Sequence, residues 1–340
     1  MVYTSISARI LLNIEALNMT ESAGNYVKHR RAPVVIPTSN GYILRYVPVI
    51  SGESIAHAYQ EILAKIAEET GLPVCSLCRQ GVFLKHTDKN VFKRTGIPAP
   101  DFKKPESVEE TIVKHCVVED VGGFLNTDAA LKRTSRFYAG YMIPALDSIK
   151  TSAAEAQFHV RYDPLSIQTQ AIYNIEAGSA LYVLTLGLDI DGIGVSSIAL
   201  ENSKPKPLVS PEERSKRIEA AFKAMHLLVT QMLFGAKRTR FMPNWKIMSL
   251  AILTTHPLPL NVRPAHTSKY IEETIESVNH AVELLGKGAS KIEEKALLAY
   301  YSAEEKPVVG ESSVSIYEAR TPDEAFNKSY EYIQELLGMK

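Results

Sequence analysis

Apolar residues occupy every second position near the start of the chain. They are Ile6, Ala8, Ile10, Leu12, Ile14 and Ala16. Because successive side chains of a β-strand point to opposite faces, this period of two predicts a strand over residues 5–17. We expect the strand to be half-buried, with Ser5, Ser7 and Arg9 on its polar face. Such a strand is not stable alone, so the rest of the chain must supply its sheet.

The next segments predict a hairpin and a helix. The turn Ser39-Asn40-Gly41 separates two extended runs within residues 33–50, which is typical of a β-hairpin. Ser51 can cap a helix that ends at Gly71, two residues before a proline.

Further strand signals follow at residues 157–162, 171–175, 179–188, 193–200 and 246–253. A long helix lies among them, from Pro211 to about Gly235. The order of strand, helix, strands, helix and strand predicts an α+β fold with a modified ferredoxin-like core, the arrangement of RNA-recognition-motif (RRM) domains. Residues 72–150 have weak periodicity and interrupt this order, so we interpret them as an inserted helical region.

The predicted organisation has four parts. Residues 1–71 form the first part of the core, 72–150 the insertion and 151–260 the rest of the core. Residues 261–340 form a mainly helical C-terminal region. With 45% hydrophobic residues, the chain can bury a sizeable core.

Charge and cysteine content narrow the possible partners. The net charge is zero, but residues 271–340 carry 7 Lys and Arg against 14 Asp and Glu, which leaves 31 against 24 in residues 1–270. The basic part is suited to a polyanion and the acidic part to a protein contact. Three cysteines, and no segment typical of a signal peptide or a membrane span, favour a cytoplasmic protein without a membrane partner.

The sequence contains no nucleophile elbow, Walker loop, dinucleotide fingerprint or HExxH motif. We therefore expect no catalytic site and no cofactor. Cys75-Ser-Leu-Cys78 has the spacing of a metal-binding pair, for which His86, His115 and Cys116 are the nearest further ligands. We expect ordinary buried thiols and no metal, with zinc as the alternative.

Three segments are candidates for binding a nucleic acid. Lys28-His29-Arg30-Arg31 lies in a polar loop. Ser51-Gly52-Glu53-Ser54 opens a helix, where free backbone N–H groups can bind phosphate. The segment containing Lys237, Arg238 and Arg240 lies between the second long helix and the strand at 246–253, where the other two segments could converge.

In these residues the chain resembles the DevR-type, Cas-seven family of backbone subunits in archaeal type I-A CRISPR Cascade complexes. The resemblance covers nearly the whole chain. It lies in Ser7-Ala-Arg9-Ile-Leu-Leu-Asn13, Glu21-Ser-Ala-Gly24-Asn25-Tyr-Val-Lys28, Val49-Ile-Ser51-Gly52-Glu-Ser54-Ile-Ala-His57, Glu119-Asp-Val-Gly122-Gly123-Phe124 and Gly235-Ala-Lys237-Arg238-Thr-Arg240-Phe-Met-Pro243.

The resemblance implies a non-catalytic subunit that polymerises along guide RNA and presents it for pairing with target DNA. It also implies a palm built on the core, a finger at 72–150 and a β-hairpin thumb near 156–178. The implied partners are guide RNA, target DNA, a Cas-five subunit and copies of the chain itself. By matching position, the resemblance implies that phosphate is bound by Lys28, Arg30, Ser51, Gly52, Ser54, Lys237, Arg238 and Arg240. It implies that the thumb includes Phe158, His159, Arg161 and Tyr162. His29 and Arg31 are further candidates from the basic cluster, and His57 stands where related subunits often carry a basic residue.

A metal-dependent endoribonuclease is the alternative function. Type III relatives are similar in fold and carry an Asp in the loop after the first strand. Here that loop offers Glu21, Asn18, Asn25 and His29, and no Asp. Cleavage would require a general base or metal ligand at that place.

Overall fold

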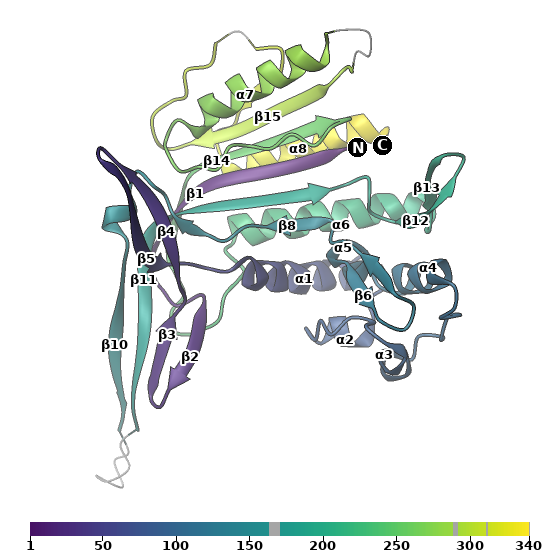
Figure 1. The fold of residues 1–340 in the computed structure, drawn as a ribbon, viewed down its shortest axis with the longest axis horizontal. Helices are drawn as coiled ribbons and strands as arrows, with labels where there is room; N and C mark the ends of the chain where they lie inside the picture. The colour runs from purple at the N-terminus through teal and green to yellow at the C-terminus, as the bar shows by residue number, and fades with distance from the viewer. Residues whose placement is uncertain (163–170, 288–291, 311, 340) are drawn as a thin grey trace.

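The computed structural model describes residues 1–162, 171–287, 292–310 and 312–339, and Figure 1 shows their arrangement. The chain has a mixed α/β fold with one large sheet. The central order of the sheet is β16-β15-β14-β1-β11-β3-β2. Helices cover both faces of this sheet.

The predicted first strand is the centre of the sheet. β1 (Tyr3–Glu15) pairs antiparallel with β14 (Asn244–His256) on one side and with β11 (Ala171–Asp189) on the other. The alternation therefore identified the strand correctly, but the expected half-burial is wrong. Ser5 and Ser7 are buried because each hydroxyl accepts a backbone N–H from the segment that follows β14. The third polar residue, Arg9, is buried in ion pairs with Asp147 at 2.9 Å and Glu304 at 2.8 Å.

The sheet extends beyond its centre on both sides. β15 (Lys295–Ser302) pairs with β14, and β16 (Ser315–Glu318) runs parallel to β15. On the other side β8 (Phe137–Ala139) and β9 (Ile143–Pro144) pair with the second half of β11. The regions expected to be helical, 72–150 and 261–340, thus also contribute strands. β8 and β9 are too short for a periodic signal, and β15 is a nearly continuous buried apolar run without alternation.

The first half of β11 leaves the main sheet in a projecting arm. It forms a hairpin with β10 (Ala153–Arg161), as the strand signals predicted, and pairs in parallel with β3 (Tyr26–His29). β3 in turn pairs with β2 (Met19–Ala23). The segment interpreted as a polar loop is therefore a second hairpin, which lies beside the arm in Figure 1.

Helices bury the two faces of the sheet in separate apolar clusters. α1 (Gly52–Glu69), α6 (Pro211–Thr230) and α8 (Pro322–Leu337) pack on one face against Ile6 and Ile10. α7 (Tyr270–Leu285) packs on the other face against Leu253 and Leu298. The predicted helix cap is confirmed, since the Ser51 hydroxyl accepts the Ser54 N–H at 3.3 Å.

The inserted region packs beneath α1 (Figure 1). It contains α2 (Ser76–Arg79), α3 (Lys89–Thr95), α4 (Pro105–His115), α5 (Val117–Gly122), β6 (Phe124–Asn126) and β7 (Leu131–Arg133). Asp120 joins it to α6 through ion pairs with Arg133 and with Arg217, the latter at 2.8 Å. All three side chains are buried, so this network fixes the insertion against the core.

Two further hairpins project from the surface. The predicted hairpin is confirmed as β4 (Arg31–Thr38) and β5 (Gly41–Pro48), joined through Ser39 and Asn40. β12 (Val195–Glu201) and β13 (Lys204–Pro207) form the other, and a short 3-10 helix spans Ile149–Thr151. Among the described helices, none has the length and apolar content that crossing a membrane requires.

Candidate nucleic-acid interface

The three candidate segments, two of them basic, meet where β1 ends. The Leu17 carbonyl accepts the N–H of Ala236, and the Ala16 carbonyl that of Lys237, at 2.8 and 3.4 Å. The next residue, Asn18, accepts the Arg30 N–H with its backbone oxygen at 2.8 Å. Asn18 also accepts the Ser51 N–H with its side-chain oxygen, at 2.8 Å. The predicted convergence of residues 28–31, 51–54 and 237–240 is therefore confirmed, and Asn18 links two of the three segments.

A glycine permits the closest of these approaches. Gly235 has a φ of +102°, and a Cβ atom at this position would lie 2.5 Å from Leu17 Cδ2. Any other residue would strain the backbone and displace Leu17. The turn that carries Lys237 thus depends on Gly235 to reach the end of β1.

A buried ion pair holds the basic cluster from beneath. His29 Nε2 lies 2.7 Å from Glu15 Oε1, and neither side chain is exposed. Tyr182 and the backbone N–H of Leu17 donate to the same carboxylate. Burial alone would raise the pKa of Glu15, but the hydrogen bond and charge of His29 and these two donors lower it. Burial would also lower the pKa of His29, and Glu15 outweighs this effect and raises it. Both directions favour the charged pair.

A second acid fixes the next part of the loop. Glu176 on β11 accepts hydrogen bonds from the Tyr26 hydroxyl at 2.6 Å and from the His29 N–H at 2.9 Å. It also forms an ion pair with Arg31 at 3.1 Å. Glu15 and Glu176 therefore both bind the β3 segment from the protein side, which leaves the outer side of this segment to solvent.

The arm places aromatic and basic side chains next to this region. His159 stacks on Tyr173, with ring centroids 5.2 Å apart, and contacts Phe241 edge-on. The Arg161 guanidinium lies over the Tyr173 ring, 5.5 Å from its centroid. His159, Tyr173 and Phe241 line a pocket of about 340 Å³, which Arg240 also lines. On the opposite face of the arm, Phe158 is 63% exposed.

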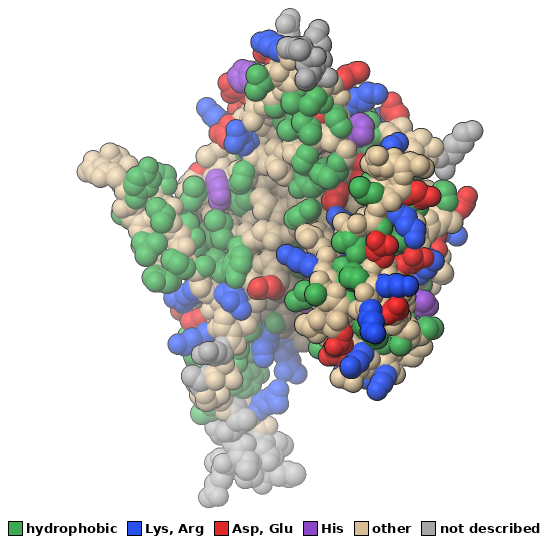
Figure 2. Space-filling view, turned by 45° about the vertical axis from the view of Figure 1, so that its right-hand side comes forward, with side chains coloured by type: hydrophobic (Ala, Val, Ile, Leu, Met, Phe, Trp, Pro, Cys, Tyr) green, Lys and Arg blue, Asp and Glu red, His purple; other side chains and the backbone are tan. Residues whose placement is uncertain are grey.

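The remaining predicted cations are available to a ligand. Within the described residues, several basic side chains near the end of β1 and along the arm form no ion pair with a carboxylate. They are Lys28, Arg30, Arg161, Lys237, Arg238 and Arg240. Figure 2 shows Lys and Arg side chains gathered along the arm. A cluster of unpaired cations on a surface with stacked aromatics is suited to a single-stranded polyanion.

Several predicted residues need correction. His29 is buried against Glu15, so a direct phosphate contact does not fit its position. Ser51 is also buried, with its hydroxyl used as the helix cap. Gly52 allows close packing on the β8 backbone, since a Cβ there would lie 2.5 Å from the Ala139 carbonyl oxygen. Arg31 is partly neutralised by Glu176.

Two other predicted residues lie in the first two turns of α1. Ser54 is half-buried beside the cap, and the exposed His57 ring contacts Phe83 and lies 3.4 Å from Glu61. The side chain of Glu21, the carboxylate of the nuclease alternative, falls outside the described residues. Sequence reasoning missed the supporting role of Glu15 and Glu176. The only available signal for Glu15 was its polar position at the end of an otherwise alternating strand.

The fold and the site together define a mixed α/β protein with a broad basic surface at one end of its sheet. The family model of the CRISPR-associated negative auto-regulator DevR/Csa2 matches residues 6–275. The CRISPR-associated aCascade subunit Cas7/Csa2 2 of Saccharolobus solfataricus is 44% identical over 289 residues, which cover 84% of this chain and 89% of that protein. The CRISPR-associated protein Cas7/Csa2 1 of the same organism is 38% identical over 313 residues, covering 90% and 94%. The chain therefore belongs to the DevR/Csa2 family of CRISPR-associated Cas7 proteins.

Solved structures agree with this fold. A chain of a CRISPR RNA-guided surveillance complex in a pre-nicking state matches with a TM-score of 0.53 and 11% sequence identity. The match covers 97% of this chain and 99% of the other.

The buried ion pair predicts a specific dependence of stability on pH. Glu15→Gln leaves His29 without its counter-ion and should lower the free energy of unfolding by about 3–5 kcal/mol. The pair contributes its full stabilisation between pH 4.5, the ordinary pKa of Glu, and pH 6.5, the ordinary pKa of His. Its contribution is lost as pH falls through the lowered pKa of Glu15 or rises through the raised pKa of His29. Chemical denaturation from pH 4 to 9 measures this difference.

Glu61→Gln is the matched control, because Glu61 lies beside His57 in an exposed pair on α1. This substitution should change stability by less than about 1 kcal/mol. Equal effects of the two substitutions at every pH would show that the Glu15 pair does not support the loop.

Proposed function

We propose that this chain is a non-catalytic subunit that binds guide RNA along the backbone of a Cascade complex. The observation that carries the proposal is the convergence of two basic segments and the start of α1 at the end of β1, where Glu15 and Glu176 bind the segment 26–31 from beneath. Relatives named as Cas7 proteins and as an aCascade subunit support the same conclusion.

We infer a modified ferredoxin-like or RRM palm for the core. In chain order the core elements are β1, α1, β8, β11, α6 and β14, and in the sheet the strands lie in the order β14-β1-β11-β8. Both orders are those of a ferredoxin-like domain. In this proposal residues 1–71 and 151–260 build the palm, 72–150 the finger and 261–340 a region packed on the palm. The β10–β11 arm is the thumb.

The chemistry of the surface favours the RNA backbone over particular bases. Lys28, Arg30 and Lys237 are charged groups on short segments, and neutralising phosphates with such groups binds any sequence. The partly exposed Tyr26 adds an aromatic face on which bases stack without strong preference. Phe158 on the outer face of the thumb is an apolar side chain that can be inserted between neighbouring bases. Guide RNA would thus be held by its backbone, with other bases free to pair with target DNA.

Assembly with other subunits is part of the proposal. The β4–β5 hairpin exposes Tyr42, Leu44 and Tyr46, and Figure 2 shows it as an apolar projection. An exposed apolar patch of this kind is typical of a protein interface. We propose that this patch contacts a neighbouring copy of the chain along the RNA. We propose that the acidic residues of 271–340 contact a basic surface of another copy or of a Cas-five subunit. The site of action would be the cytoplasm.

Charge reversal tests the assigned interface. Arg30→Glu and Lys237→Glu should each weaken binding to unrelated single-stranded RNAs on the order of tenfold, and by the same factor for every sequence. Lys65→Glu is the control, because it lies roughly 20 Å along α1 from Ser51 at 1.5 Å per residue. Fluorescence anisotropy at fixed salt measures the affinities. Unchanged affinity for both interface variants would refute the assignment.

A cleavage assay separates the proposal from the ribonuclease alternative. Protein assembled on guide RNA is incubated with labelled complementary RNA and Mg²⁺ or Mn²⁺. We expect the target RNA to remain intact. Metal-dependent cuts that disappear in a Glu21→Gln variant would instead establish the nuclease.

A further inference from the structure

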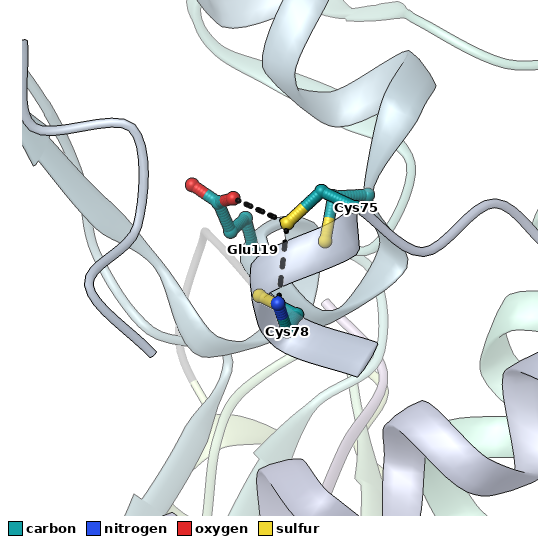
Figure 3. Close-up of side chains that lie close together, drawn as sticks. Cys75, Cys78 and Glu119 are labelled. Atoms are coloured by element: carbon teal, nitrogen blue, oxygen red, sulfur yellow. Dashed lines mark hydrogen bonds between the residues drawn. The ribbon is translucent and has the colours of Figure 1, made fainter. Parts of the chain in front are cut away.

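The three cysteines of the chain meet in one buried cluster away from the basic surface. Cys75 directly precedes α2, which carries Cys78, and Cys116 precedes α5, which carries Glu119. One ligand atom from each of these four residues lies within 4.8 Å of all the others, and all four residues are buried. Figure 3 shows Cys75 and Cys78 with Glu119 directed toward them.

The two halves of the cluster are built in the same way. Cys75 is the N-cap of α2 and Cys78 its third residue, while Cys116 is the N-cap of α5 and Glu119 its third residue. Each half therefore supplies two ligands separated by two residues, the spacing that tetrahedral metal sites use. A backbone hydrogen bond from Val117 to Pro73, at 2.9 Å, holds the two helix starts together.

We propose that Cys75, Cys78, Cys116 and Glu119 bind one Zn²⁺ ion as a closed structural site. Zinc–sulfur bonds of about 2.3 Å place tetrahedral ligands roughly 3.5–4 Å apart. The observed 3.6 Å between Cys75 Sγ and Glu119 Oε1 agrees with this separation. Thiolate ligands favour Zn²⁺ over the hard cations Mg²⁺ and Ca²⁺. This inference replaces the expectation of ordinary buried thiols without a metal.

Hydrogen bonds around Glu119 support a role as ligand. Its carboxylate lies 2.6 Å from His86 Nδ1 and accepts the His86 backbone N–H at 2.8 Å. His86 Nε2 lies 2.9 Å from the Thr95 hydroxyl, which itself donates to the Val91 carbonyl, so Nε2 carries a proton. An outer partner that orients a metal ligand in this way is a regular feature of metal sites.

The charges near the cluster also fit a bound metal. With Zn²⁺, three thiolates and one carboxylate, the site carries two negative charges. His86, whose ring faces Glu119, and the half-buried Lys85, which donates to the Gly122 carbonyl at 2.6 Å, can supply two positive charges. The positive groups therefore lie where the negative charge of such a site would need compensation.

The site explains how two short helices are fixed in the inserted region. α2 has four residues and α5 has six, and helices of this length are not stable without outside contacts. A metal shared by both would link them and attach them to α1, against which each packs. The N-terminus of α1 lies next to the candidate RNA interface through Asn18, so the metal would stabilise the finger without touching RNA.

Metal analysis of the full-length protein, purified without a histidine tag, tests the proposal. Inductively coupled plasma mass spectrometry should find about one zinc per chain. The ion should be lost in Cys78→Ser and Cys116→Ser and retained in His115→Ala, because His115 is exposed outside the cluster and its ring contacts Thr111. A chelator should lower the melting temperature of the wild-type protein. It should not change the RNA affinity at temperatures where the protein stays folded.

A second measurement covers the case in which the cysteine variants do not fold. Wild-type protein is stripped of metal, titrated with Co²⁺ and followed by its absorption, where thiolate ligation gives strong charge-transfer bands. One equivalent of Co²⁺ displaced by Zn²⁺ supports the site. The proposal would be overturned if the folded wild-type protein contains no metal and binds neither ion. In that case its cysteines would be three free thiols or would include a Cys75–Cys78 disulfide.

Discussion

The position of β1 determines the rest of the structure. It is hydrogen-bonded on both edges, covered on both faces and ends at the buried Glu15. A strand fixed on all sides cannot shift its register without moving the whole core. The residues that follow it, Ala16 to Asn18, are therefore presented at a constant place, and each accepts a backbone N–H from one of the basic segments.

This arrangement separates the residues that hold the loops from those that can bind a ligand. Glu15, Glu176 and Asn18 satisfy backbone groups and the cations that point inward. Lys28, Arg30 and Lys237 remain without acidic partners among the described residues. A rigid surface of unpaired cations binds phosphates without reorganising, which favours affinity over base specificity. In the proposed assembly, specificity is left to base pairing by the guide.

The sequence predicted those turns, helix ends and strands that are determined by neighbouring residues in the chain. The Ser39-Asn40 turn, the Ser51 cap and the alternation from Ile6 to Ala16 each act within a few residues, and all three were located from the sequence. Pairing between distant segments was not visible. β8 joins the main sheet through Leu186 to Leu188, about fifty residues later, and its three residues carry no periodic signal. The burial of His29 depends on its ion pair with Glu15, and Tyr182, which also binds Glu15, lies far from the basic cluster in sequence. Composition alone cannot show which member of Lys28-His29-Arg30-Arg31 points inward.

The most direct test of the proposed function is the salt dependence of binding to unrelated single-stranded RNAs and to a duplex control, with protein freed of bound nucleic acid. If the six unpaired cations each contact a phosphate, a plot of log affinity against log salt should have a slope of about −4 for every single strand. Binding to the duplex should be much weaker. A slope near zero, or equal binding to the duplex, would contradict the account.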